Sequence, residues 1–283
     1  MLKARLMIQL ISCGLMNPHI GNFLAGKIYR GELKNFCTPG LNCYSCPAAT
    51  FACPIGALQA VGGTANFNFS FYVAGFLILI GAIFGRAICA FVCPFGLFQE
   101  ILYKLPTKKL KLWQPLIYIK YFVLTIFVLI LPATVTNFAG VGAPAFCEYI
   151  CPAGTLEAGL PLIATHSEYR NILGELFTLK FSILILTIIG SCTVYRFFCR
   201  VLCPLGAIYS ILNRYSIYNL FFYKKTCIDC GKCSKICKMK VQPNSQTRSA
   251  ECILCGECEK VCPTGAICLG FNKNVSAKEE NFK

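Results

Sequence analysis

Histidine is almost absent from this chain of 283 residues, which contains only His19 and His166. These two lie on very different segments and make a poor axial pair for a b-type haem. No Cys-x2-Cys-His motif marks a c-type haem. No Gly-x-Gly-x-x-Gly motif follows a strand, so a dinucleotide site has no support. The sequence also lacks a Ser/His/Asp arrangement or paired carboxylates, which leaves acid–base and nucleophilic catalysis without residues.

Charged residues are scarce too, at 14% of the chain against 56% hydrophobic residues. Soluble domains have roughly 25% charged and 45–50% apolar residues, so the composition predicts a mainly α-helical, polytopic membrane protein. Lys and Arg number 27 against 12 Asp and Glu, a formal charge of +15. Such a charge can indicate a nucleic-acid partner. We expect none, because no clustered basic face on a soluble domain is evident.

Three apolar runs predict membrane spans near residues 69–86, 116–135 and 176–195. Lys120 and Lys180 lie within about two turns of the ends of their spans, so we expect them to snorkel to the lipid boundary. A crossing by residues 6–24 is doubtful, because Pro18 and nearby polar residues suggest a broken or re-entrant helix. The loop after the first span is rich in lysine, which by the positive-inside rule predicts a multi-pass protein of the cytoplasmic membrane with this loop in the cytoplasm. Its lysines are Lys104, Lys108, Lys109 and Lys111.

Cysteine is abundant, with 21 residues, and much of it lies in a Cys-Pro-x-Gly phrase that occurs four times. Proline suits the first position of a helix, so each cysteine is predicted at an N-cap. There its sulfur faces free N–H groups and the positive helix end, which stabilise a thiolate or a metal–thiolate cluster. A disulfide scaffold is a poorer explanation, because such scaffolds are short and hydrophilic. The four phrases begin at Cys53, Cys93, Cys151 and Cys203.

The phrases divide the membrane portion into two parallel pseudo-repeats, each with a cysteine turn, a span, an arginine and a second cysteine turn. If the halves pack about a pseudo-two-fold axis, two cysteines from each half supply four ligands on each side of the membrane. The predicted cytoplasmic ligands are Cys89, Cys93, Cys199 and Cys203. The predicted outer ligands are Cys46, Cys53, Cys147 and Cys151. Cys43 competes with Cys46, and Cys37 has no assigned role.

Arg86 and Arg196 each stand three residues before a predicted ligand, Cys89 and Cys199 respectively. A cation beside an anionic cluster would stabilise the reduced form and raise its potential. A positive-inside anchor would occupy the same position, and one residue can serve both purposes.

The C-terminal region contains two cysteine runs of the form Cys-x2-Cys-x2-Cys-x3-Cys, as in bacterial ferredoxins. In that pattern the fourth cysteine of each run ligates the other run's cluster. One predicted [4Fe–4S] site therefore contains Cys227, Cys230, Cys233 and Cys262, and the other contains Cys237, Cys252, Cys255 and Cys258. Zinc is the competing interpretation, but a third cysteine at the same spacing in both runs favours iron–sulfur.

These motifs predict three regions: an N-terminal apolar segment with outer cysteine turns at 1–68, a membrane domain at 69–222, and a two-cluster ferredoxin domain of α+β fold with a polar tail at 223–283. The chain resembles the membrane-bound polyferredoxins of the NapH, NosR and CcoG types over roughly residues 69–267. The shared features are the paired Cys-x3-Cys-Pro turns at Cys89/Cys93 and Cys199/Cys203, followed by the two-cluster module. The additional outer turns depart from that pattern.

The resemblance implies an electron-transfer protein of the cytoplasmic membrane. Combined with the cysteine sets, it predicts a relay of four [4Fe–4S] clusters from a cytoplasmic ferredoxin-like or flavin donor to an extracytoplasmic redox acceptor such as a flavoprotein. Two alternatives stay open: a subunit that exchanges electrons with quinone or quinol, and a redox assembly factor for a metalloprotein. Each predicts an electron-transfer component rather than a stand-alone enzyme.

Overall fold

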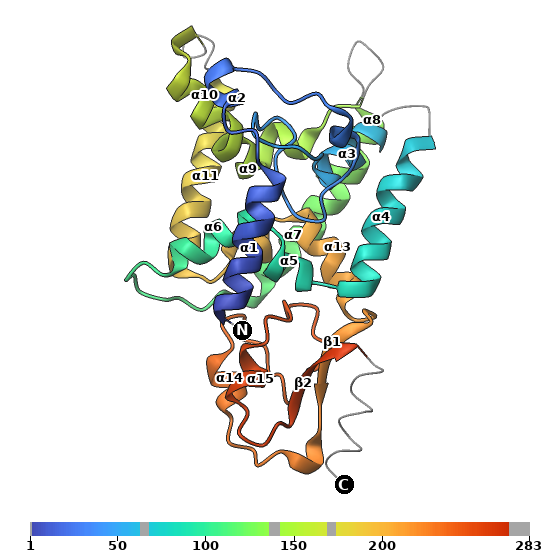
Figure 1. Ribbon diagram of the computed structural model, residues 1–283, viewed down its shortest axis with the longest axis vertical. Helices are drawn as coiled ribbons and strands as arrows, with labels where there is room; N and C mark the ends of the chain where they lie inside the picture. Colours follow the sequence, from blue (N-terminus) through green and yellow to red (C-terminus); the bar gives the residue numbers. More distant parts are fainter. Residues whose placement is uncertain (1, 63–67, 136–141, 169–173, 272–283) are drawn as a thin grey trace.

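The structure is a computed structural model that describes residues 2–62, 68–135, 142–168 and 174–271. It consists of a tall helical body with a small head at one end, as Figure 1 shows. The N-terminus lies beside the junction of body and head, while α2 and α10 lie at the opposite end. The polar tail predicted after residue 271 lies outside the described residues.

The body contains short helices interspersed among a few long ones. Its helical elements are α1 (Leu2–Met16), α2 (Asn22–Ala25), η1 (Glu32–Asn35), α3 (Pro54–Gly62), α4 (Asn68–Phe84), α5 (Ala87–Phe91), α6 (Pro94–Tyr103), η2 (Gln114–Tyr118), α7 (Ile119–Val123), η3 (Leu124–Ile130), α8 (Leu131–Thr134), η4 (Phe146–Ile150), α9 (Pro152–Gly154), η5 (Thr155–Gly159), α10 (Leu160–Thr165), α11 (Glu175–Thr193), α12 (Phe197–Val201) and α13 (Pro204–Asn213).

Two stretches among the described residues are long and apolar enough to cross a membrane, Gln114–Thr134 and Glu175–Thr193. They match the second and third predicted spans. The first predicted span is the shorter helix α4, of 17 residues. Only 17% of the apolar window in α11 is buried, so most of that window faces outward. Because soluble proteins rarely expose such continuous apolar surface, this supports association with a membrane.

Lys120 does not reach the lipid boundary, contrary to the sequence-based expectation. Its side chain is fully buried and its ammonium donates a 2.9 Å hydrogen bond to Ser210 Oγ. Lys180 is half-buried and donates to the carbonyl of Cys147 at 3.2 Å. Both lysines turn inward because buried acceptors are available on neighbouring helices, which offset the cost of burying an ammonium group.

The head is built on a two-stranded antiparallel sheet of β1 (Tyr218–Phe222) and β2 (Ile267–Phe271), with Leu220 opposite Leu269. Its helical elements are η7 (Lys224–Thr226), α14 (Lys232–Ile236) and α15 (Glu257–Val261). Apolar residues of the head pack against the end of the body in two clusters, one around Ala87 and one around Ala90 and Tyr195. The head is therefore fixed to the body by a shared core.

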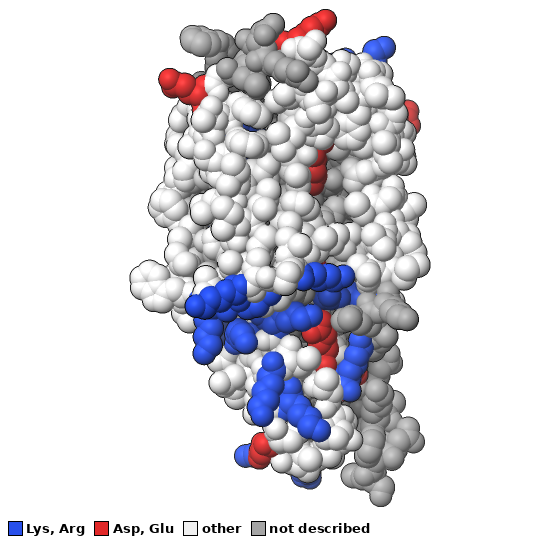
Figure 2. Space-filling model, turned by 90° about the vertical axis from the view of Figure 1, so that its left-hand side faces the viewer, with Lys and Arg blue, Asp and Glu red and all other residues white. Residues whose placement is uncertain are grey.

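Charge is distributed unevenly along the long axis. In Figure 2, Lys and Arg side chains form a belt where the body meets the head, and further ones lie on the head. Most of the body above the belt is uncharged on this face. Such a distribution is typical of a protein whose apolar part lies in lipid with the basic belt at the headgroup level.

Candidate metal centres

The cysteine of each Cys-Pro-x-Gly phrase directly precedes a helix, as predicted. Cys93, Cys151 and Cys203 are N-caps with proline in the first turn, and α3 begins at Pro54 after Cys53. The Cys203 sulfur accepts a hydrogen bond of 3.3 Å from the Gly206 N–H. Proline leaves the first helical N–H position empty and fixes the entry angle, so the sulfur faces the next free donors.

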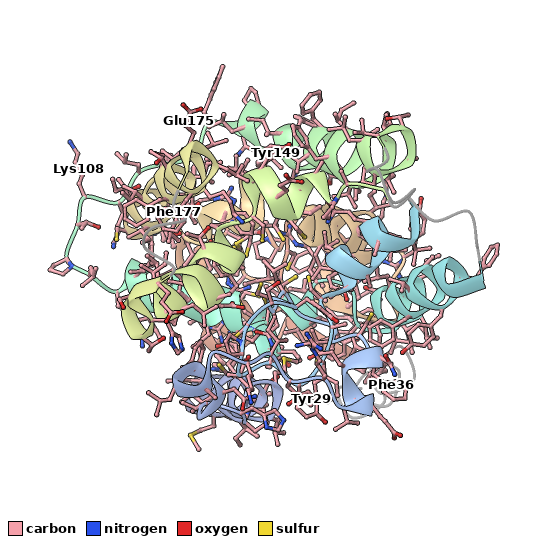
Figure 3. The ribbon with its side chains drawn as sticks, turned by 90° about the horizontal axis from the view of Figure 1, so that it is seen from above. Tyr29, Phe36, Lys108, Tyr149, Glu175 and Phe177 are labelled. Carbon is pink, nitrogen blue, oxygen red and sulfur yellow. The ribbon has the colours of Figure 1, made fainter. Side chains whose placement is uncertain are left out.

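The cysteines of the second and fourth phrases meet near the head. Cys89 and Cys93 from one half lie within electrostatic range of Cys199 and Cys203 from the other. All four are buried. We call Cys89, Cys93, Cys199 and Cys203 the head-side set. Seen along the long axis in Figure 3, most sulfur atoms lie inside the ring of helices, while Lys108 and Glu175 point away from it.

The first and third phrases contribute a second group inside the body, further from the head (Figure 1). Cys53 and Cys147 both lie close enough to Cys151 for their thiolates to interact electrostatically with it. A Cβ atom added at Gly56, three residues after Cys53, would lie 3.9 Å from the Cys147 sulfur. Cys43 also interacts with Cys53 and Cys151, and an added Cβ at Gly154 would lie 3.6 Å from its sulfur. We call Cys43, Cys53, Cys147 and Cys151 the far set.

Cys46, predicted as a ligand here, occupies a different environment. It packs in a small cluster with Ala48 and Ala49, and the charged groups acting on it are Glu157 and Lys34. Cys53 and Cys151 are among the groups that act on Cys43 and are not among those that act on Cys46, so the geometry favours Cys43.

Six residues after the cysteine of the first two phrases, in the seventh position counted from that cysteine, a glutamine links the halves of the body. Gln99 Nε2 donates to the Cys199 sulfur at 3.0 Å, and its Oε1 accepts from the Phe198 N–H at 3.0 Å. Gln59 repeats this arrangement, donating to the Cys147 sulfur at 3.2 Å and accepting from the Phe146 N–H at 2.9 Å. Both side chains are fully buried. Each glutamine therefore orients a cysteine of the opposite half and supplies a hydrogen bond to its sulfur.

The same position in the third phrase is Glu157, whose carboxylate accepts a hydrogen bond of 2.7 Å from the Cys43 N–H. In three of the four phrases the seventh residue thus contacts a cysteine or its backbone: Gln99 contacts Cys199, Gln59 contacts Cys147, and Glu157 contacts Cys43. In the fourth phrase, Tyr209 donates to the Pro39 carbonyl at 2.9 Å. The sequence repeat could have revealed these four contacts, since the seventh residue belongs to each copy.

Arg86 and Arg196 lie beside the head-side set and are both fully buried. Arg86 donates to the Cys199 carbonyl at 3.4 Å, and Arg196 donates to the Cys89 carbonyl. Each arginine therefore contacts the cysteine segment of the other half. Complete burial excludes the lipid-anchor interpretation, since a snorkelling side chain would reach the surface.

The two arginines have different carboxylate partners. Arg196 pairs with Glu100, which also accepts hydrogen bonds from Arg5 at 2.7 Å and from Tyr195 at 2.8 Å. Arg86 pairs with Glu251 of the head at 2.9 Å. Sequence analysis did not identify either glutamate, because nothing in the local pattern distinguishes them from surface residues.

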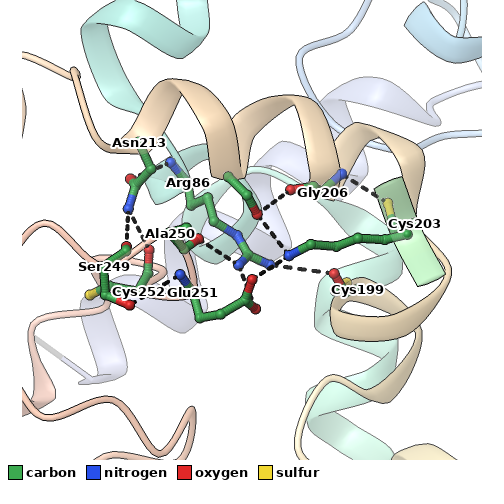
Figure 4. A network of polar contacts seen from close by, with 11 residues as sticks. Arg86, Cys199, Cys203, Gly206, Asn213, Ser249, Ala250, Glu251 and Cys252 are labelled. Atoms are coloured by element: carbon green, nitrogen blue, oxygen red, sulfur yellow. Dashed lines mark hydrogen bonds and ion pairs between the residues drawn. The ribbon is translucent and has the colours of Figure 1, made fainter. Parts of the chain in front are cut away.

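Glu251 joins the head to the body, as Figure 4 shows. It binds Arg86 and Lys120, two cations that are fully buried. Burial alone would raise the pKa of Glu251, but the two cations overcome it and lower the pKa to about 2. Asn213 completes the junction by accepting from the Arg86 N–H at 2.9 Å and donating to the Cys252 carbonyl at 3.1 Å.

The segment after Cys37 enters the body and touches both cysteine sets. The Leu41 N–H donates to the Cys93 sulfur at 3.4 Å, and Cys43 of the far set follows two residues later. A chain advances at most about 3.6 Å per residue, so the Cα atoms of Leu41 and Cys43 lie within about 7 Å of each other. A Cβ on Gly40 would come within 2.9 Å of Cys93 Cα. Only glycine permits this approach, which brings the two sets close together inside the body.

The eight cysteines of the head line two cavities. One is lined by Cys227, Cys230, Cys233 and Cys262, which we call the distal head set. The other is lined by Cys237, Cys252, Cys255 and Cys258, which we call the proximal head set. These are the two groups expected from the exchanged fourth cysteine. Glycines with positive φ precede α14 and α15, at Gly231 and Gly256, and make the tight turns between cysteines.

Each of the four sets contains four cysteines, the ligand number of a [4Fe–4S] cluster. Among the described residues, no three His, Cys, Asp or Glu side chains stand close enough to hold one metal ion. A four-iron cluster is bulkier than an ion and holds its thiolates further apart. Four cysteines, free backbone N–H groups and a buried apolar lining are the environment that iron–sulfur clusters require.

Two families described as 4Fe-4S binding domains match the chain. One matches residues 66–112, 121–160 and 177–225, a region that includes three of the four Cys-Pro-x-Gly phrases. The other matches residues 248–268, the second cysteine run of the head. No solved structure matches.

Two uncharacterized proteins of Methanocaldococcus jannaschii are similar to this chain. One is 29% identical over 209 residues, covering 70% of each chain. The other is 32% identical over 174 residues, covering 58% of this chain and 61% of the relative. The "Putative electron transport protein YccM" of Escherichia coli is 25% identical over 187 residues, 62% of this chain and 48% of the relative. The chain therefore contains 4Fe-4S binding domains, and its sequence and structure support a function in iron–sulfur electron transfer.

Proposed function

We propose that the chain is a multi-pass membrane protein that relays electrons through four [4Fe–4S] sites between a low-potential donor on the head side and a redox acceptor on the far side. The sites follow one another as the distal head set, the proximal head set, the head-side set and the far set. When bound, such clusters each exchange one electron at potentials that charge, hydrogen bonding and exposure adjust. By the charge rule, the head lies in the cytoplasm.

The observation that carries this proposal is the short connection between the two sets of the body. The Leu41 N–H contacts Cys93 of the head-side set, and Cys43 of the far set lies two residues away. Electron tunnelling weakens steeply with distance, so a relay needs neighbouring sites in close succession. Arg86 makes the equivalent connection to the head, since it contacts both the Cys199 carbonyl and the Ala250 carbonyl.

The surrounding residues would orient and shield the ligands. Gln59 and Gln99 hold Cys147 and Cys199 by hydrogen bonds to their sulfurs. Phe95, Phe146 and Phe198 are buried in the same core and exclude water from the body. A dry site strengthens the electrostatic effect of each nearby donor and cation.

The test uses full-length protein loaded anaerobically with iron and sulfide and reconstituted in liposomes with the head outside. Dithionite supplied outside should reduce ferricyanide trapped inside, and the protein should contain about sixteen irons, the count for four cubanes. The variant Cys151→Ser should keep reducible sites in the head but lose transfer to the trapped acceptor. An iron content near eight, or equal transfer by this variant, would refute the relay. Reduction of a quinone analogue without transfer across the bilayer would favour the quinone alternative.

A further inference from the structure

We infer that the surface around the distal head set is the docking face for an acidic, soluble one-electron carrier protein. This inference rests on the proposed function, in which the distal head set is the first site of the relay. The charge and the exposed side chains around the distal head set indicate the kind of partner that would dock there.

The distal head set is the most accessible of the four. Cys230 is exposed, and the other three cysteines of the set are partly exposed. In contrast, Cys258 of the proximal head set is buried, and so are all four cysteines of the head-side set. Because tunnelling requires close approach, a protein partner must reach the relay where a cysteine lies at the surface.

An apolar contact point lies directly beside this opening. Ile228 lines the same cavity as Cys230, and 64% of its surface is exposed. An exposed isoleucine between two cysteines of a site loses water contact only when another protein covers it. Interfaces typically have such an apolar centre with a charged rim.

Lysines are concentrated in the segment that carries three cysteines of the distal head set, and one of them, Lys232, lines its cavity. Residues 224–240 contain six lysines and a single acid, Asp229. One of these lysines, Lys238, is paired with Glu257. The other five are exposed and form no ion pair within the described residues, and four of them lie within three residues of a cysteine of the distal head set: Lys224, Lys225, Lys232 and Lys235.

This arrangement fits a carboxylate-rich partner. Asp229 offsets only one of these positive charges, and its N–H donates to the Cys227 sulfur at 3.4 Å. Positive charge concentrated around an entry site raises the rate of encounter with an anionic partner by roughly 10- to 1,000-fold at low ionic strength. It also orients the partner so that its own redox centre faces the opening.

The test measures both binding and reduction. Cluster-loaded full-length protein in neutral phosphatidylcholine nanodiscs is mixed with a reduced flavodoxin rich in surface carboxylates, over a range of salt concentrations. The patch variant carries Lys224→Glu, Lys225→Glu, Lys232→Glu and Lys235→Glu. The control variant has the same change in charge at exposed positions outside the head: Lys104→Glu, Lys108→Glu, Lys111→Glu and Arg214→Glu.

We expect the patch variant to bind the flavodoxin at least about 10-fold more weakly at low salt and to lose the decrease in rate with salt. The control variant should change little. Ile228→Gln should weaken binding while keeping the salt dependence. Dithionite reduction and iron content should be unchanged in all variants. These readouts separate docking from the relay, because a protein that fails to transfer electrons across liposomes can still show the difference in flavodoxin binding.

Three results would overturn the inference. Equal losses in the patch and control variants would mean that the overall field, and not this surface, attracts the carrier. Unchanged binding in the patch variant would show that the carrier docks elsewhere. The nanodisc-embedded protein could also bind phosphatidylglycerol vesicles. If the patch variant abolishes that binding and leaves flavodoxin binding unaffected, the lysines belong to a lipid-binding surface.

Discussion

Glu251→Gln should weaken the attachment of the head and shift the potentials of the two sites that flank the junction. The side chain keeps its size, but Arg86 and Lys120 lose their shared negative partner while remaining buried. Removing one member of a buried ion pair costs about 3–5 kcal/mol, because the remaining charge is left without compensation. We expect the thermal midpoint of the loaded protein to fall by roughly 10 °C.

The change in potential can be worked out from the same contacts. At roughly 8 Å and an effective dielectric constant of about 20, one elementary charge alters the energy of an added electron by about 2 kcal/mol. Since about 1.4 kcal/mol corresponds to 59 mV for a one-electron couple, the potential should rise by about 90 mV. Glu251 precedes Cys252 and binds Arg86, which contacts the Cys199 carbonyl. Both the proximal head site and the head-side site should therefore shift.

A matched control is available in the same head. Glu257 precedes Cys258 of the proximal head set, but its partner Lys238 is 41% exposed and touches the body only through the ring of Tyr195, 5.6 Å from its ammonium, with no ion pair to a body residue within the described residues. Glu257→Gln should shift the proximal head site by a similar amount, cost less than about 1 kcal/mol, and leave the head-side site unchanged. Redox titration followed by electron paramagnetic resonance measures all of these values. If Glu251→Gln alters only the proximal head site, or leaves the thermal midpoint unchanged, the junction does not couple the two sites.

Four further substitutions test the body. Cys43→Ser should lose about four of sixteen irons, whereas Cys46→Ser should keep all of them, and the reverse result by iron analysis would restore the sequence-based assignment. Gln99→Leu removes the donor to a cysteine sulfur and should lower the head-side potential by tens of millivolts in a redox titration; an unchanged potential would contradict the role of that hydrogen bond. Glu100→Gln leaves two arginines without their carboxylate and should destabilise the protein by about 3–5 kcal/mol in thermal unfolding. Burial alone would raise the pKa of Glu100, but its arginine partners lower it, so wild-type stability should fall as the pH drops below the usual carboxyl range, and this loss should be absent in the variant.

The sequence predicted the cysteine phrases well because their geometry is local. Proline at the first helical position fixes the cysteine before it, and this holds at Cys93, Cys151 and Cys203. The two groups of head cysteines also follow from spacing alone. In both cases a short segment determines its own conformation, so no knowledge of distant contacts is needed.

The fourth cysteine of the far set and the environment of Lys120 could not be predicted in this way. Cys43 and Cys46 lie in a loop without periodicity, and the hydrogen bond that holds the Cys43 backbone is made with Glu157, which lies 114 residues away in sequence. The partner of Lys120 is Glu251, at a separation of 131 residues. A lysine in an apolar run is ordinarily expected to snorkel, and only a buried carboxylate from another domain reverses that expectation.

The two halves of the body differ in the charges that matter most for the junction with the head. Arg86 and Arg196 make reciprocal contacts with the carbonyls of Cys199 and Cys89, but Arg196 is neutralised within the body by Glu100, whereas Arg86 depends on Glu251 of the head. A body expressed without the head would keep two buried cations with no carboxylate, at a cost of several kcal/mol. Body and head should therefore fold as one cooperative unit, and the head cannot be treated as a separable ferredoxin on a tether.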